Sequence, residues 1–256
     1  MGAISTNRGT IDLVEAGGGD ATPILFLHGV GSDHHVWAPQ IDHFSSERRG
    51  IALAYPGYGD SVLVEDATRD DYAASVLATM DSLAVDCAHI CGLSLGGVVA
   101  IALHAMAPAR CASLIIADSF AKHPDGQGIY DRSEAASRTI GMRALAEARV
   151  DALLGSAATP AMRHAVIDTM SAINPAAYVL GARAVWLADQ RDRAAAIDVP
   201  TLVLVGDEDV ITPAALSEQL AALIPGAKLA IIPGAGHLTN LEQPEAFNAA
   251  IEGFLR

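Results

Sequence analysis

A serine lies between two glycines in the segment Cys91 to Gly97, after a short apolar run and before a helix-like run. A strand that turns sharply into a helix strains its central residue and requires small neighbours, here Gly92 and Gly96. Such a turn holds the Ser94 hydroxyl at the carboxyl end of a sheet. The first free N–H groups of the helix, beginning with that of Leu95, point to the place where an oxyanion would develop. The segment therefore predicts a nucleophile and one oxyanion donor.

A nucleophilic serine needs a carboxylate and a histidine, which in this arrangement follow it in the order Ser, Asp or Glu, His. The buried-strand pattern Leu202 to Val205 leads into a turn with three acids: Asp207, Glu208 and Asp209. The next strand pattern, Leu229 to Ile232, is followed by His237. Ligands bind at the carboxyl ends of strands in open α/β sheets, so these residues are expected to meet Ser94 there.

A fourth carboxylate leaves the choice of acid open. Asp118 ends the strand pattern Leu114 to Ala117, which predicts a position at the same edge of the sheet. The histidine requires one carboxylate on its second ring nitrogen, to fix the tautomer and to stabilise the imidazolium. The residues alone do not decide between Asp118 and the three acids after Val205.

Nearly the whole chain resembles the α/β-hydrolase superfamily, and within it the 3-oxoadipate enol-lactonase-like branch. Several segments carry the resemblance: Leu27 to Gly31, Trp37 to Gln40, Pro56 to Ser61, Cys91 to Gly97, Gly206 to Asp209 and Gly236 to Pro244. The elbow around Ser94 and the run His-Leu-Thr-Asn-Leu-Glu-Gln-Pro are the most specific of these.

The resemblance implies a cofactor-free serine hydrolase that cleaves a small carboxylic ester or lactone through an acyl-enzyme. It assigns the acid to Asp209, with Asp118 second, and the second oxyanion donor to the backbone N–H of Val30. Two other functions stay open: a C–C bond hydrolase of the meta-cleavage type, although Leu238 stands where those enzymes have a tryptophan, and a non-catalytic small-molecule receptor on the same fold.

Strand patterns alternate with helical ones and predict a mainly parallel α/β sheet, of the eight-stranded type that the resemblance implies. Between Phe120 and Ile197 the strand signal stops and alanine-rich sequence of helical period begins. We expect residues 1–119 and 198–256 to form the core and residues 120–197 to form a helical lid. The predicted lid helices are Arg132 to Val150, Pro160 to Ala172 and Pro175 to Gln190.

The lid differs from the rest of the chain in charge. The protein carries a net charge of -14, whereas the lid has nine basic and eight acidic residues. An acidic chain is a poor partner for nucleic acid and anionic membrane surfaces. If the substrate is anionic, a lid arginine should bind it, and Arg143 and Arg183 are the candidates. His34 and Trp186 are further candidates for substrate contact.

The remaining features indicate a single ordinary domain. The 256 residues are 51% hydrophobic, and charges or glycines interrupt every apolar run before it could span a membrane. The histidines His34 and His35 lack a metal-lactonase spacing, and there is no glycine-rich phosphate loop, so neither a metal nor a nucleotide is expected. We expect a cytoplasmic protein. Its oligomeric state stays open, with a homodimer as one alternative.

Overall fold

A computed structural model describes residues 2–256 and has eight strands in one sheet. The strands follow the order β1-β2-β4-β3-β5-β6-β7-β8, and all neighbours from β4 to β8 are parallel. Their bounds are β1 Gly2–Thr6, β2 Gly9–Ala16, β3 Ile24–Leu27, β4 Gly50–Leu53, β5 Ala88–Leu93, β6 Cys111–Ala117, β7 Thr201–Gly206 and β8 Lys228–Ile232. The predicted α/β-hydrolase sheet is confirmed.

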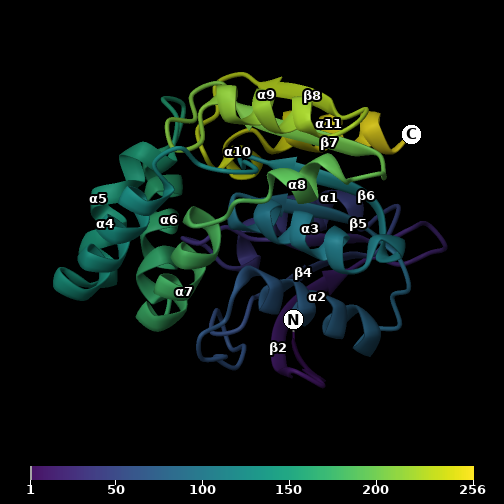
Figure 1. The fold of residues 1–256 in the computed structure, drawn as a ribbon, viewed down its shortest axis with the longest axis horizontal. Helices are drawn as coiled ribbons and strands as arrows, with labels where there is room; N and C mark the ends of the chain where they lie inside the picture. The colour runs from purple at the N-terminus through teal and green to yellow at the C-terminus, as the bar shows by residue number, and fades with distance from the viewer. Residues whose placement is uncertain (1) are drawn as a thin grey trace.

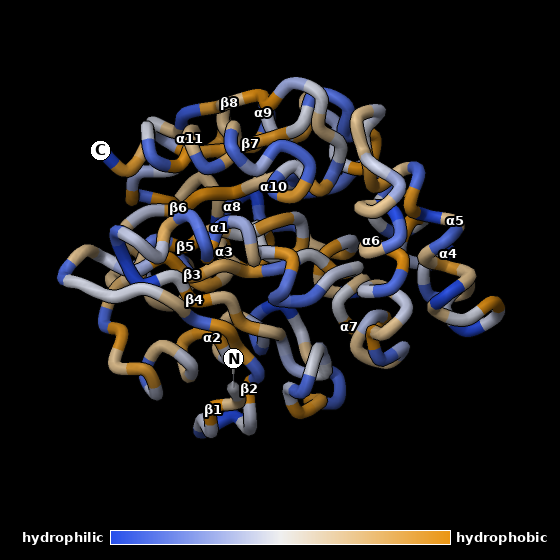
Figure 2. Tube along the Cα trace, turned by 180° about the vertical axis from the view of Figure 1, so that it is seen from behind, coloured by the Kyte–Doolittle hydropathy of each residue, from blue (hydrophilic) through white to orange (hydrophobic). Residues whose placement is uncertain are grey.

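Helices cover both faces of this sheet (Figure 1). On one face α1 (Ala38–Phe44) packs against α11 (Pro244–Leu255). On the other, neighbouring helices pack in a row: α2 (Arg69–Ser82), α3 (Leu95–Met106), α8 (Arg191–Ala195) and α9 (Ala214–Leu223). The central strands β3, β4 and β7 are buried along their whole length, as expected for a parallel sheet covered on both sides. Figure 2 shows these strands mainly in the orange of hydrophobic residues, inside the surrounding helices.

Four of the five α-helices between β6 and β7 gather at one end of the sheet (Figures 1 and 2). We call them the inserted helices: α4 (Gly126–Thr139), α5 (Gly141–Leu153), α6 (Pro160–Ala172) and α7 (Pro175–Trp186). α5 packs against α6, α4 packs against α7, and α7 contacts α3 of the core. Pro160 and Pro175 stand in the first turns of α6 and α7, where a missing N–H costs nothing.

The inserted helices correct two predicted boundaries. The helix predicted over Arg132 to Val150 is two helices, because Gly141 adopts a left-handed φ of 76° and breaks it. The helix predicted to reach Gln190 ends at Trp186. Gln190 instead donates a 2.7 Å hydrogen bond to the carbonyl of Val98, which ties the end of the segment to α3.

Two further elements complete the site. The short helix η1 (His34–Trp37) follows the His-Gly turn after β3, and α10 (Thr239–Glu242) follows the loop that contains His237. No helix of the described residues is long and apolar enough to cross a membrane.

Candidate active site

Ser94 occupies the sharp turn between β5 and α3. Its backbone has φ 55° and ψ -112°, and its N–H donates to the carbonyl of Ala117 at 2.9 Å. A Cβ on Gly92 would lie 2.2 Å from the carbonyl oxygen of Gly96, and one on Gly96 would lie 2.0 Å from that of Leu27. Both glycines are therefore required by close backbone approach, as the sequence pattern predicts. The turn holds a nearly buried serine at the carboxyl end of the sheet.

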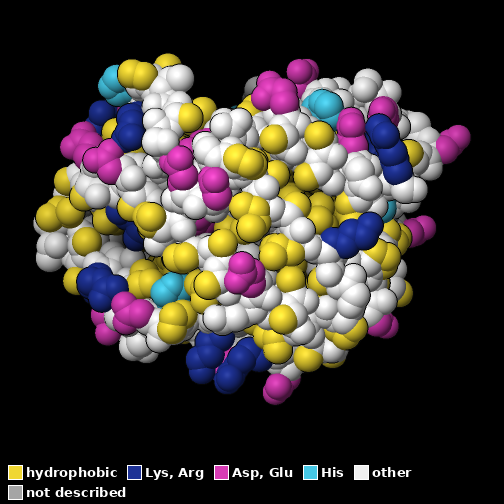
Figure 3. Space-filling view, turned by 90° about the horizontal axis from the view of Figure 1, so that it is seen from above, with side chains coloured by type: hydrophobic (Ala, Val, Ile, Leu, Met, Phe, Trp, Pro, Cys, Tyr) yellow, Lys and Arg dark blue, Asp and Glu magenta, His cyan; other side chains and the backbone are white. Residues whose placement is uncertain are grey.

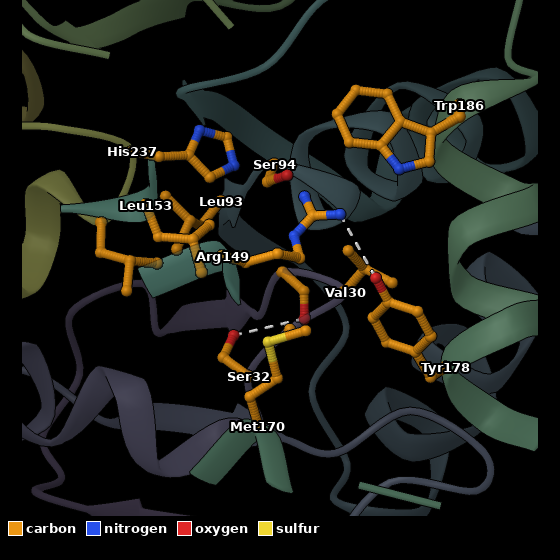
Figure 4. A pocket seen from close by; sticks show the side chains of 13 residues that line it. Val30, Ser32, Leu93, Ser94, Arg149, Leu153, Met170, Tyr178, Trp186 and His237 are labelled. Carbon is orange, nitrogen blue, oxygen red and sulfur yellow. Dashed lines mark hydrogen bonds between the residues drawn. The ribbon is translucent and has the colours of Figure 1, made fainter. Parts of the chain in front are cut away.

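His237 and Asp209 are hydrogen-bonded in the loops after β8 and β7. The Nδ1 atom of His237 lies 2.8 Å from Oδ2 of Asp209, and both side chains are buried. In this contact Nδ1 carries the proton and donates it to the Asp209 carboxylate, which leaves Nε2 as the basic nitrogen. The imidazole and the Ser94 hydroxyl line one cavity (Figure 4).

Asp209 is held as an anion by several donors. Its Oδ1 accepts from the N–H groups of Ile211 and Thr212, and its Oδ2 accepts from the Thr212 hydroxyl at 2.6 Å. Burial alone would raise the pKa of Asp209, but the interaction with His237 and the bonds from Thr212 outweigh it and lower the pKa to about 2. The carboxylate is therefore charged whenever the histidine needs it.

The three other candidate acids bond elsewhere. Asp118 is buried and its Oδ1 accepts from the N–H of Gly206 and from the Thr239 hydroxyl. Burial, and then the charge of Asp209, raise its pKa well above the ordinary range. The two further carboxylates accept hydrogen bonds from neighbouring loops: Asp207 accepts from the N–H of Gly234, and Glu208 accepts from the N–H and the hydroxyl of Ser156.

Two backbone N–H groups close to Ser94 are free of protein acceptors within residues 2–256. Val30 belongs to the turn after β3 and lines the cavity, and Leu95 is the first residue of α3 directly after Ser94. Preorganised donors of this kind stabilise the negative charge of a tetrahedral intermediate.

The cavity around Ser94 is small and mostly apolar. It offers about 20 Å³, little more than one water molecule requires. The core contributes the lining side chains of Val30, Ser32, Leu93, Ser94, His237 and Leu238, and the inserted helices contribute those of Arg149, Leu153, Met170, Tyr178 and Trp186 (Figure 4). Trp186, a residue predicted to contact substrate, is thus at the cavity.

Three other residues predicted to contact substrate lie away from it. Arg143 is on the surface, with its side chain 62% exposed between Glu147 and Asp168. Arg183 donates to the carbonyl of Asp66 at 3.0 Å. His34 is buried behind the turn, 3.8 Å from Asp12, and it is absent from the cavity wall. None of the three side chains lines the cavity around Ser94, because each is engaged by a residue distant in the sequence: Asp168 for Arg143, Asp66 for Arg183 and Asp12 for His34.

Arg149 was missed by the sequence reasoning, although it lines the cavity. One feature of the sequence could have suggested Arg149 as a cavity residue. Arg143 has an acid four residues on, Glu147, whereas Arg149 has Leu145 and Leu153 at the positions four before and four after it. An arginine with apolar neighbours on its own helix face points toward the core. Arg183 shares this pattern and lies elsewhere, so the signal alone does not select the residue.

A carboxylate joins the inserted helices to the histidine loop. Glu242 accepts from the N–H of Gly155, in the connection between α5 and α6, at 2.6 Å. It also accepts from the N–H groups of Gly236 and Leu238, on either side of His237. The N–H of His237 itself donates to the carbonyl of Leu153 at 3.0 Å. We call this set of contacts the Glu242 junction.

One group of side chains has the composition of metal ligands. Potential ligand atoms of Asp33, His34 and His35 lie within 4.8 Å of one another at η1. The Asp33 carboxylate caps η1 by accepting from the N–H of His35, and it also contacts the ring of that histidine at 3.2 Å. Burial, followed by repulsion from His35, lowers the pKa of His34. The group belongs to the turn behind Ser94 and does not contact the cavity.

Comparison with known proteins identifies the family. The model of the alpha/beta hydrolase family matches residues 24–250. The 3-oxoadipate enol-lactonase 1 of Acinetobacter baylyi is 30% identical over 99% of this chain and 96% of its own. A carboxylesterase of Bacillus subtilis is 29% identical over 98% of this chain and 86% of its own.

Solved structures agree over the full length. The enol-lactonase from Burkholderia xenovorans LB400 superposes with a TM-score of 0.93 at 27% identity, covering 99% of each chain. A thermophilic esterase from Thermogutta terrifontis, with malate bound, superposes with a TM-score of 0.91 at 28% identity and covers 99% of this chain and 97% of its own. Elbow, sheet order and relatives lead to one conclusion: this chain is an enzyme of the alpha/beta hydrolase family.

Proposed function

We propose that the protein hydrolyses a small carboxylic ester or lactone through an acyl-enzyme, with Ser94 as nucleophile, His237 as base and Asp209 as acid. The observation that carries this proposal is the 2.8 Å contact between His237 Nδ1 and Asp209 Oδ2, beside a cavity that also contains Ser94. The similarity to an enol-lactonase and to a carboxylesterase supports the same reaction class.

Each group has a defined task in this reaction. As the Ser94 oxygen bonds to the substrate carbonyl carbon, Nε2 of His237 takes the hydroxyl proton, and the N–H groups of Val30 and Leu95 stabilise the oxyanion. Collapse of the intermediate breaks the bond to the leaving oxygen, which receives that proton. Water then attacks the acyl-enzyme with His237 as base again, releasing the acid and restoring Ser94.

The inserted helices act as the lid in this proposal. Residues 120–197 supply one wall of the cavity, and the 20 Å³ that remains excludes bulk water from the nucleophile. A substrate larger than a water molecule must displace part of this wall. Met170 is suited to such adjustment, because its unbranched side chain adapts to irregular shapes.

Substitution of Ser94 by alanine tests the proposal directly. We expect Ser94→Ala to lower kcat on 4-nitrophenyl esters by roughly 10⁶-fold, as loss of a triad serine does elsewhere, without changing the melting temperature by more than a few degrees. A fluorophosphonate should add covalently to Ser94 of the parent, which peptide mass spectrometry can locate. Labelling at another residue, or an active alanine variant, would contradict the assignment.

The substrate panel separates the remaining functions. We propose screening 4-nitrophenyl esters of graded length beside lactones, enol-lactones and a vinylogous diketone of the meta-cleavage type. Turnover of esters or lactones supports the proposal, whereas exclusive turnover of the diketone indicates a C–C hydrolase. Ligand-dependent stabilisation with no turnover of any member would indicate a receptor.

A further inference from the structure

Arg149 differs from every other basic side chain between Phe120 and Ile197. Eight of these nine Lys and Arg side chains lie within 4.0 Å of a carboxylate, at distances up to the 3.9 Å between Arg183 and Asp66. Figure 3 shows one face of the molecule, on which several Lys and Arg side chains lie beside Asp or Glu side chains. Within residues 2–256 Arg149 has no carboxylate at that distance, and it is the one that reaches the catalytic cavity.

Hydroxyl groups orient the Arg149 guanidinium without neutralising it. Its Nη1 lies 3.3 Å from the Ser133 hydroxyl and 3.4 Å from the Tyr178 hydroxyl, both long contacts. Ser133 and Tyr178 are buried on α4 and α7, and Arg149 itself is half-buried on α5. A guanidinium offers five N–H donors, and only one nitrogen is used here. A half-buried cation without an anion is costly, so the arrangement is complementary to an anionic group.

Trp186 provides a second unpartnered donor at the same place. Its side chain is 2% exposed, and its Nε1–H has no hydrogen-bond partner among residues 2–256. In Figure 4 the nitrogen lies on the ring edge turned toward Arg149. Both side chains line the catalytic cavity and also a larger hollow of about 680 Å³ between α5 and α9. Arg149 and Trp186 therefore lie between the cavity at Ser94 and this larger hollow.

We infer that Arg149 and Trp186 form a carboxylate-binding subsite, so that the favoured substrate is an ester or lactone with a free carboxylate a few atoms from the scissile carbonyl. The guanidinium binds the carboxylate through charge-assisted hydrogen bonds, and the indole N–H donates a further one. The surrounding apolar wall strengthens these bonds by excluding water. This inference rests on the proposed ester or lactone hydrolysis and specifies its substrate class.

A matched pair of substrates tests the subsite. 4-Nitrophenyl hydrogen glutarate carries the carboxylate, and its methyl ester is the uncharged analogue; release of nitrophenolate reports both. We expect the parent to prefer the acid in kcat/KM. Arg149→Gln should lower kcat/KM for the acid by about 10- to 100-fold, mainly through KM, and that for the methyl ester by less than about 5-fold. Trp186→Phe, which keeps an aromatic side chain and removes the N–H donor, should reduce the preference by about 5-fold.

Arg143→Gln is the matched control, because it removes a lid arginine that lies in surface pairs. It should leave both rates and their ratio as in the parent. A preference that survives Arg149→Gln, or is absent from an active parent, would overturn the subsite while leaving the hydrolase intact.

Binding of glutarate by calorimetry separates failure of the subsite from failure of the proposed reaction. We expect the parent and Arg143→Gln to bind glutarate, and Arg149→Gln to bind it at least 10-fold more weakly. If the parent hydrolyses neither ester, the proposed reaction fails, and this binding difference still decides the subsite. Equal binding by the parent and Arg149→Gln would overturn it.

Discussion

Two buried aspartates at the ends of adjacent strands have pKa values that are shifted in opposite directions. Asp209 follows β7 and has a pKa lowered to about 2, whereas Asp118 follows β6 and has a pKa raised well above the ordinary range. The strands are paired in register, and both side chains are almost fully inaccessible to solvent. Burial is thus common to both and does not explain the difference.

The donors around each carboxylate explain it. Asp209 receives two N–H groups, one hydroxyl and the imidazole of His237. Asp118 receives one N–H and one hydroxyl on Oδ1, while its Oδ2 has no partner among residues 2–256. A buried carboxylate stays ionised when enough donors replace its water, and otherwise it binds a proton. In this site the carboxylate whose two oxygens both accept hydrogen bonds from the protein is Asp209, which lies beside His237.

The largest effect expected from this comparison is at Asp209. Asp209→Asn should lower kcat by roughly 10⁴-fold, because the amide favours the wrong histidine tautomer and no longer stabilises the imidazolium. Steady-state kinetics on a 4-nitrophenyl ester measures the loss, and circular dichroism verifies the fold. Near-parent activity in this variant would show that another group serves as the acid.

A smaller effect is expected at Thr212, whose hydroxyl bonds Asp209 at 2.6 Å and lies 3.3 Å from His237 Nδ1. Thr212→Val keeps the side-chain shape and removes one donor to a charged group, a loss of about 1.5 to 3 kcal/mol in stability. We expect kcat to fall by about 10-fold, since Asp209 and His237 become less well oriented. Thr212→Ser should restore most of the activity, and failure of that rescue would point to packing instead of the hydroxyl.

The smallest effect on activity is expected at Asp118. Asp118→Asn should change kcat by less than about 3-fold, because the amide resembles the protonated acid and tolerates the left-handed φ of 47°. A crippled Asp118→Asn enzyme beside a mild Asp209→Asn enzyme would reverse the roles of the two aspartates.

Stability against pH sharpens the same contrast. Because the folded pKa of Asp118 lies above its ordinary value of 3.8, folding retains a proton that the unfolded chain releases. Asp118 therefore contributes less to stability as pH rises from about 4, whereas Asp209 contributes fully above that pH and less below it. The melting temperature of Asp118→Asn, relative to the parent, should rise between pH 4 and pH 8. A constant difference would contradict the raised pKa.

Local sequence was sufficient to predict the turn around Ser94 and the edge of the sheet at which Asp209 and His237 meet. Glycines at 92 and 96 are fixed by contacts within a few residues of Ser94 or with the adjacent strand, and the parallel topology brings Asp209 and His237 to the same edge. β1 was not predicted, because the five residues Gly2–Thr6 are mostly exposed on an edge strand and have little apolar pattern.

The substrate side was much less predictable. Whether Arg143, Arg149 or Arg183 faces the cavity depends on how α4 to α7 pack together and on which distant acids they meet, such as Asp66 for Arg183. A helical period indicates that a helix is amphipathic, but it does not identify the element against which each face packs. Arg149 lines the cavity, and within residues 2–256 it lacks the carboxylate partner that the other Lys and Arg side chains of residues 120–197 have.

The Glu242 junction has a consequence for protein engineering. A Cβ on Gly236 would lie 2.5 Å from the backbone nitrogen of Gly155, and one on Gly155 would lie 2.9 Å from that of Gly236. The two chain segments are in direct backbone contact, so neither accepts a side chain without displacing the other. A chimaera that exchanges the inserted helices for those of a relative must therefore transfer residues 153–156 together with the loop 236–242. A graft that stops at the ends of the helices would misplace His237.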